Sequence, residues 1–199
     1  QSRRSFAASH PNNELMKQTL NFTAELVPVA YAEALLALAE EFGLARAELF
    51  AAARVRPEVL GSPNGRLSFL DFHLLTQTAL ERCGEPALGL VLGQRLNVST
   101  HGILGYAVLS SANLGKALQF ALKYYRVLGL AFELELVEQE EDMQLRALES
   151  FPMGPQSRFA AEGLLTSIHT IARFLVGEEL RGLAVGFAYP TPDYAERYA

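Results

Sequence analysis

The chain has 199 residues, enough for one domain with a sizeable hydrophobic core and few for two. Half of the residues are hydrophobic and 20% are charged, a balance that excludes a largely disordered protein. The net charge is -5, whereas a domain that binds nucleic acid unaided concentrates Lys and Arg, so we do not expect this chain to bind DNA alone.

The cellular compartment is indicated by the single cysteine, Cys83, which has no partner for an internal disulfide and is typical of a reducing environment. The longest apolar runs are broken by Glu, Arg or Gly before the roughly 20 residues of a membrane span. We therefore expect a cytoplasmic protein without a membrane partner. Residues 1–20 are expected to form a flexible arm, and residues 21–199 one domain.

The first part of the chain has the apolar spacing of successive helices. Ser68 and Asp71 resemble a capping box, in which a Ser side chain accepts a hydrogen bond from the first helical turn. Ser111 or Asn113 is expected to cap a longer helix in the same way. Apolar residues three and four positions apart predict helices over residues 31–42, 46–53, 68–83, 86–92, 104–109 and 114–128.

A change of period marks the next part of the chain. Over residues 132–136 and 143–147, apolar side chains alternate with other residues, which predicts two strands with one solvated face. The acidic residues 138–142 between them lack the Asn-Gly of a tight turn, so a looser hairpin is expected. Glu133 or Glu135 would then pair with Arg146 on the neighbouring strand.

Helical period returns over residues 158–176, where one apolar face is expected to be buried and Glu162, Thr166, His169 and Arg173 lie on another stripe. Residues 183–189 alternate large with small side chains and predict a further strand. The expected fold class is α+β, mostly helical with a small, largely antiparallel sheet from the C-terminal half.

Residues 39–50 have the apolar-Gly-apolar spacing of a helix-turn-helix. A recognition helix offers hydrogen-bonding groups to base edges and lies close to phosphates. Here the second helix is rich in alanine, and Glu40 and Glu41 flank the turn. These features favour a packed helical hairpin over the alternative of a DNA-reading unit.

No group of residues in the sequence indicates catalysis or a metal site. There is no Gly-x-Ser-x-Gly elbow, phosphate loop or dinucleotide fingerprint. The four histidines form no His-x-x-x-His pair and have only one cysteine to join them. We expect neither an enzyme nor a cofactor or metal site.

Tyr124, Tyr125 and Arg126 close the helix expected over residues 114–128. Aromatic hydroxyls beside a guanidinium suit a pocket that orients a polar or carboxylate ligand. The favoured alternative is that Tyr125 packs in the core and Arg126 covers the negative end of the helix dipole.

The stretch His101-Gly102-Ile103-Leu104-Gly105-Tyr106, continuing to Leu118, combines a glycine-hinged turn, a short helix and the start of a long helix. It resembles the signature segment of the arabinose-binding-type N-terminal domain of AraC/XylS transcription regulators, and residues 84–93 resemble the segment that precedes it. The resemblance implies a domain that senses a small effector or mediates dimerisation. It also implies a separate C-terminal DNA-binding domain, absent from this sequence, as the only route to DNA.

We therefore expect a ligand-sensing regulatory domain that binds a small organic effector of unknown identity and controls DNA binding by that separate domain. The alternative is an effector-independent dimerisation module, and a homodimer is an expected assembly. The resemblance implies no dependable set of ligand residues. Polar or aromatic groups near helix or strand ends are the candidates, namely His73, His101, Tyr106, Tyr124, Arg126 and Phe187.

Overall fold

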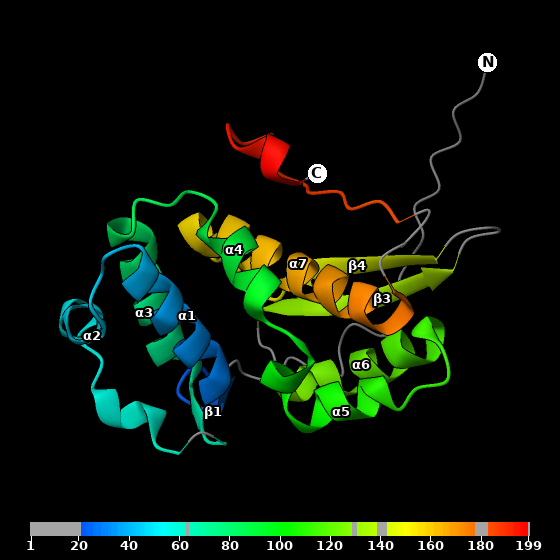
Figure 1. The fold of residues 1–199 in the computed structure, drawn as a ribbon, viewed down its shortest axis with the longest axis horizontal. Helices are drawn as coiled ribbons and strands as arrows, with labels where there is room; N and C mark the ends of the chain where they lie inside the picture. The colour runs from blue at the N-terminus through cyan, green and yellow to red at the C-terminus, as the bar shows by residue number, and fades with distance from the viewer. Residues whose placement is uncertain (1–20, 63, 129–130, 139–142, 178–182, 199) are drawn as a thin grey trace.

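A computed structural model describes residues 21–198 except 63, 129–130, 139–142 and 178–182; the side chains of 124, 126–128 and 138 are also outside the description. The expected α+β class is confirmed. Helices α1, α2 and α3 gather at one end of the domain, whereas α5, α6 and the β3–β4 hairpin lie at the other (Figure 1). Helices α4 and α7 run between these two groups.

The described elements follow in this order: β1 Glu25–Pro28, α1 Val29–Glu41, α2 Arg46–Ala53, η1 Pro57–Leu60, β2 Arg66–Ser68, α3 Phe69–Arg82, α4 Leu88–Arg95, η2 Val98–His101, α5 Ile103–Leu109, α6 Leu114–Leu128, β3 Phe132–Glu138, β4 Met143–Glu149, η3 Gly154–Gln156, α7 Ser157–Val176 and η4 Ala195–Tyr198, where η marks a short 3-10 helix.

The hydrophobic core is centred on α1, α2 and α3 and extends to α4 and α7. Leu36 of α1, Leu49 of α2 and Leu75 of α3 are each fully buried. Leu88 of α4 and Phe159 of α7 belong to the same buried cluster. Burial of these side chains supplies most of the driving force for folding, since apolar burial is the dominant favourable contribution.

The α1–α2 pair is the packed hairpin that the charge pattern favoured over a DNA reader. Leu44 in the turn is buried, and so is Phe50 on α2. Arg46, at the start of α2, bonds Glu33 of α1 at 2.8 Å, so its guanidinium is engaged by a carboxylate of this chain. The exposed face of α2 carries Ala47, Glu48 and Ala51, which offer neither donors to base edges nor a cation to phosphates.

Two helix starts follow from their capping residues. The Ser68 hydroxyl accepts from the Asp71 backbone N–H at 3.0 Å and donates to the Asp71 carboxylate at 2.6 Å, which confirms the predicted cap of α3. Of the two caps considered for α6, Asn113 is the one whose side chain accepts from a first-turn N–H, that of Lys116, at 2.9 Å.

The predicted hairpin is confirmed as the antiparallel pair β3–β4, whose register places Glu135 opposite Arg146. The turn at residues 139–142 lies outside the described residues. A second antiparallel pair, β1–β2, was not predicted and lies in the N-terminal half. Its strands have four and three residues, too few for an alternating pattern to stand out.

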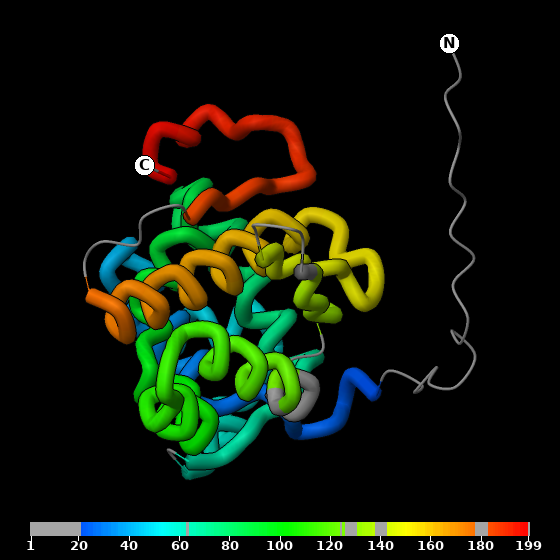
Figure 2. Tube along the Cα trace, turned by 90° about the vertical axis from the view of Figure 1, so that its right-hand side faces the viewer, coloured from blue at the N-terminus to red at the C-terminus, as the bar shows by residue number. Residues whose placement is uncertain are grey.

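The strand predicted over residues 183–189 is wrong. The described residues 183–189 join no sheet, and the segment passes over α4 and α7 (Figures 1 and 2). Its aromatic side chains pack with one another instead: the Phe187 ring centroid is 4.9 Å from that of Tyr189 and 5.0 Å from that of Tyr198. Alternation of large and small residues marks a strand only where a neighbouring strand edge is available.

Helices α4 and α7 approach closely because glycines lie where they cross. A β-carbon on Gly93 would stand 2.7 Å from the backbone oxygen of Gly163, and one on Gly89 would collide with the backbone of Phe159. The stretch Gly154–Val176 is long and apolar enough to cross a membrane by length and composition. Its packing on α4 and its buried Glu162 are those of a core helix in a globular domain.

Candidate functional site

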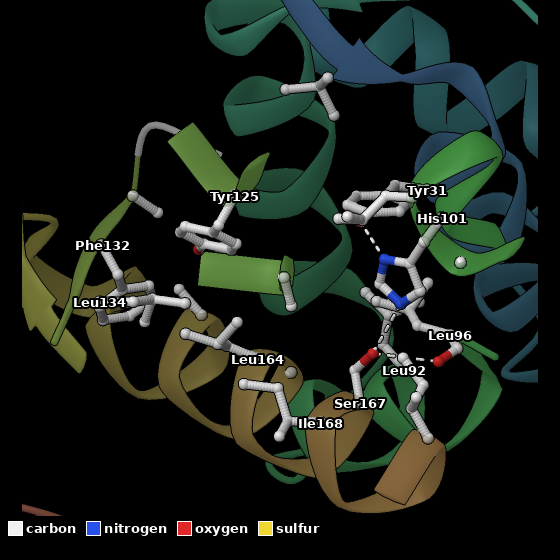
Figure 3. A pocket seen from close by; sticks show the side chains of 18 of the residues that line it. Tyr31, Leu92, Leu96, His101, Tyr125, Phe132, Leu134, Leu164, Ser167 and Ile168 are labelled. Carbon is white, nitrogen blue, oxygen red and sulfur yellow. Dashed lines mark hydrogen bonds between the residues drawn. The ribbon is translucent and has the colours of Figure 1, made fainter. Parts of the chain in front are cut away.

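A cavity of about 230 Å³ lies between α3, α4, α6, α7 and the β3–β4 hairpin (Figure 3). Most of its wall is apolar: Leu92 comes from α4, Phe132 from β3, and Leu164 and Ile168 from α7. Ligand sites are typically concave and mainly apolar, with a few polar groups that fix orientation. The cavity has this character, and its polar groups gather at two places.

One polar wall is a chain of hydrogen bonds from Tyr31 to Leu96. The Tyr31 hydroxyl is 2.6 Å from His101 Nδ1, His101 Nε2 is 3.0 Å from Ser167 Oγ, and Ser167 donates to the Leu96 carbonyl at 3.0 Å (Figure 3). These hydrogen bonds join three distant stretches of the sequence: α1, the consecutive elements α4 and η2, and α7.

The direction of this chain follows from its last bond. A carbonyl oxygen only accepts, so the Ser167 hydroxyl donates to Leu96 and accepts from His101 Nε2. The His101 proton is therefore on Nε2, and Nδ1 accepts from the Tyr31 hydroxyl. Burial lowers the pKa of His101 to about 4, against an opposing effect of a hydrogen bond to the Leu96 backbone, so the imidazole is neutral at pH 7.

The second polar corner is formed by α3 and η3. The Gln156 side-chain amide donates to the His73 carbonyl at 3.1 Å and lies 3.3 Å from His73 Nε2. Burial lowers the pKa of His73, more than the bond with Gln156 raises it, so this imidazole is also neutral at pH 7. Thr76, one turn further along α3, is 1% exposed, and among the described residues its hydroxyl has no hydrogen-bond partner.

The structure brings two of the six candidate ligand residues, His73 and His101, into the cavity wall. Tyr106 lies on α5 with 62% of its surface exposed and is not part of the described wall. Phe187 belongs to the C-terminal aromatic cluster. The side chains of Tyr124 and Arg126 lie outside the described part of the structure.

Sequence reasoning missed Tyr31, Thr76, Gln156 and Ser167 as site residues. Tyr31, Thr76 and Ser167 lie on helices whose apolar spacing is explained by core packing, and Gln156 ends the three-residue 3-10 helix η3, so no local signal distinguishes them. Tyr125, by contrast, was considered as a core residue, and it does line the cavity. Burial raises its pKa, which keeps its hydroxyl neutral.

A second polar cluster lies on a different side of α7, around Glu162. This carboxylate is fully buried, and its Oε1 accepts hydrogen bonds from Tyr194 at 2.7 Å, Tyr198 at 2.6 Å and Tyr189 at 3.3 Å. The sequence placed Glu162 on a stripe apart from the apolar one, but the C-terminal segment 183–198 covers it. Three hydroxyl donors compensate Oε1 for the water it loses on burial, whereas Oε2 is buried without a hydrogen-bond partner among the described residues.

Further contacts fasten the same segment. The Arg158 guanidinium lies 5.2 Å from the centre of the Tyr189 ring, and Arg197 bonds Glu85 ahead of α4 at 2.7 Å. Burial is the main reason that the pKa of Tyr189 is raised to about 12. The cluster therefore attaches segment 183–198 to both α4 and α7.

Comparison with known proteins assigns the family. The profile described as the arabinose-binding domain of AraC transcription regulator, N-terminal, matches residues 43–199. The chain belongs to this AraC regulator family. The match confirms the resemblance carried by residues 84–118, and this is a family of transcription regulators, not of enzymes.

The AraC-type relatives include the ornithine utilization regulator of Pseudomonas aeruginosa, which is 73% identical over 184 residues, 92% of this chain and 54% of that protein. Uncharacterized HTH-type transcriptional regulators of Mycobacterium bovis and Mycobacterium tuberculosis are each 27% identical over 116 residues, 58% of this chain and 34% of theirs. The chain thus spans about half the length of the first relative.

Within the described residues, no three His, Cys, Asp or Glu side chains are grouped to hold a metal ion.

Proposed function

We propose that this chain is the effector-sensing domain of a cytoplasmic AraC-type regulator, and that a small organic molecule bound in the cavity controls DNA binding by a separate domain. The observation that carries the proposal is the cavity itself, with two neutral polar corners, in a domain of this regulator family. The 73% identical relative is named for ornithine utilization, so we propose that the whole protein regulates genes of the same process.

Control by an effector requires a difference in affinity. A ligand shifts an equilibrium between two arrangements only if it binds one of them more tightly. The wall of the cavity comes from many separate elements, including α3, α6 and α7. A shift of one of these elements against another would change the shape of the cavity and, with it, the affinity for a ligand.

The test is to fill the cavity. Leu164 lines it and Leu165, the next residue on α7, is not part of the described wall. Leu164→Trp should abolish effector-dependent transcription from the target promoter by the full-length protein, whereas Leu165→Trp should retain it. An unchanged response in a folded Leu164→Trp variant would contradict the proposal.

A dimerisation role has its own supporting observation. On the short helix α5, Ile103 is 89% exposed, Tyr106 62% and Leu109 39%, and their three-residue spacing places them along one side of the helix. We propose that this surface contributes to a homodimer, since exposed apolar groups on a soluble surface commonly mark an interface. Sedimentation of Ile103→Glu should then show a weaker dimer than the parent, and an unchanged association constant would exclude α5 from the interface.

A further inference from the structure

The described wall of the cavity contains no formally charged side chain. Its polar members are two tyrosines, two histidines, a threonine, a glutamine and a serine. Burial holds both histidines in their neutral form at pH 7. Moving an unpaired charge into an apolar site costs several kcal/mol or more, so a charged group entering this part of the cavity would have no counter-charge to offset the loss of water.

Most of the hydrogen-bonding capacity of the wall is already used inside the protein. Tyr31 donates to His101, His101 donates to Ser167, and Ser167 donates to the Leu96 carbonyl. Gln156 donates to His73. These bonds fix the side chains in place, and the hydroxyls of Thr76 and Tyr125 are the other donors of the described wall.

Of these two hydroxyls, that of Thr76 is the candidate anchor. Its side chain is 1% exposed, it lines the cavity, and among the described residues its hydroxyl has no partner. A buried hydroxyl without a partner costs free energy that a ligand hydrogen bond would recover. Thr78, two residues later on the same helix, donates instead to the Leu74 carbonyl at 2.9 Å.

The size of the cavity limits the ligand. A cavity of about 150 Å³ in another protein holds benzene, so one of about 230 Å³ has room for roughly nine non-hydrogen atoms. Free ornithine has nine non-hydrogen atoms, but at neutral pH it carries two ammonium groups and a carboxylate. Volume alone therefore does not exclude it, whereas the neutral wall disfavours it.

We propose that the cavity binds an uncharged, mainly apolar molecule of this size, anchored by one hydrogen bond to the Thr76 hydroxyl. This proposal rests on the proposed function, since it concerns the same cavity. It implies that free ornithine does not occupy this cavity, so that ornithine utilization would be sensed through an uncharged compound.

The experiment compares ligands that share one chain and differ in charge. Octan-1-ol is neutral and has nine non-hydrogen atoms, octylammonium is its cationic counterpart and octanoate its anionic one. Calorimetric titration of the protein at pH 7.5 should show octan-1-ol binding at least tenfold more tightly than either ion, and no cavity binding by ornithine. Tighter binding of octylammonium, octanoate or ornithine, lost in Leu164→Trp, would overturn the proposal.

The anchor is tested by a matched pair of variants. Thr76→Val removes the hydroxyl and keeps the shape, so octan-1-ol affinity should fall about fivefold while the free protein keeps or gains stability. Thr78→Val should lower stability and leave affinity unchanged. Equal octan-1-ol affinity in Thr76→Val and the parent would exclude the anchor.

Failure of this inference and failure of the proposed function give different results. Absence of octan-1-ol binding would overturn the neutral-ligand inference. The effector-sensing role would still stand if Leu164→Trp abolished an effector response in transcription. Only an unaffected response would remove both.

Discussion

The buried imidazole of His101 should make the stability of the domain fall between pH 6.5 and 4. In the unfolded chain a histidine takes up a proton near pH 6.5, whereas burial lowers the pKa of His101 in the folded state to about 4. As the pH falls from 6.5 to 4, His101 takes up a proton more readily in the unfolded state than in the folded state, so the free energy of unfolding decreases.

The size of the effect follows from the two pKa values. The pKa of His101 is near 6.5 in the unfolded chain and about 4 in the folded state. This difference corresponds to a contribution of about 3 kcal/mol to the free energy of unfolding at pH 7, and the contribution is fully lost below pH 4. Protonation on Nδ1 would also remove the acceptor to which Tyr31 donates at 2.6 Å. His73 contributes in the same direction, because burial lowers its pKa as well.

The assay is urea unfolding followed by circular dichroism at several pH values from 7 to 4. A His101→Gln variant should be less stable than the parent at pH 7. On acidification from pH 7 to 4, however, its free energy of unfolding should fall by less than that of the parent, the difference being up to about 3 kcal/mol. Carboxylates titrate alike in both proteins, and His73→Gln serves as the comparison for the other corner. Parallel pH curves for the parent and His101→Gln would refute the buried neutral imidazole.

Two further predictions concern α7. Glu162→Gln should lower the free energy of unfolding by about 2 kcal/mol or more, because three hydroxyl donors lose their charged acceptor. Limited proteolysis should also cut segment 183–198 faster in this variant. Glu85→Gln, which removes one partner of a partly exposed ion pair, should have a smaller effect. Gly93→Ala should cost about 2 kcal/mol in thermal unfolding, because its β-carbon would meet Gly163 at 2.7 Å. Gly115→Ala on α6, where the nearest atom is 3.5 Å away, should not destabilise and serves as its control.

The helices were predictable because their information is local. Apolar spacing and the Ser68 cap located α3 within one or two residues, and the alternation of β3 and β4 located the hairpin. The pair β1–β2 escaped because seven residues in two short strands carry no periodic signal. Boundaries and long elements are thus set by nearby residues, whereas the shortest strands are set by tertiary contacts.

The error at residues 183–189 and the misplacement of Glu162 have one physical cause. An acidic residue on a polar stripe ordinarily faces water. Here the hydroxyls of Tyr194 and Tyr198 cover the carboxylate, and the segment that could have been a strand crosses α7 instead. The sequence around the glutamate does not predict this contact, and neither does the sequence around the tyrosines, because the tyrosines are 32 and 36 residues beyond the glutamate.

The candidate site was predictable only in part, for a related reason. His73 and His101 stand out as polar residues near helix ends, and both line the cavity. Tyr31 and Ser167 become recognisable only through the bonds they make to His101 across 70 and 66 residues of chain. A cavity assembled from so many distant segments has no sequence motif of its own.

The close pairing of α4 and α7 links the cavity to the C-terminal segment. Leu92 of α4 and Leu164 of α7 line the cavity, while Leu90 of α4 packs with Tyr194 and Glu162 of α7 accepts from the same tyrosine. Under the proposed function, an effector that favours one spacing of α4 and α7 would also favour one position of segment 183–198 on these helices. Because glycines leave the two backbones almost in contact, we expect the pair to move as a unit and to pass a change on the cavity side to the tyrosines.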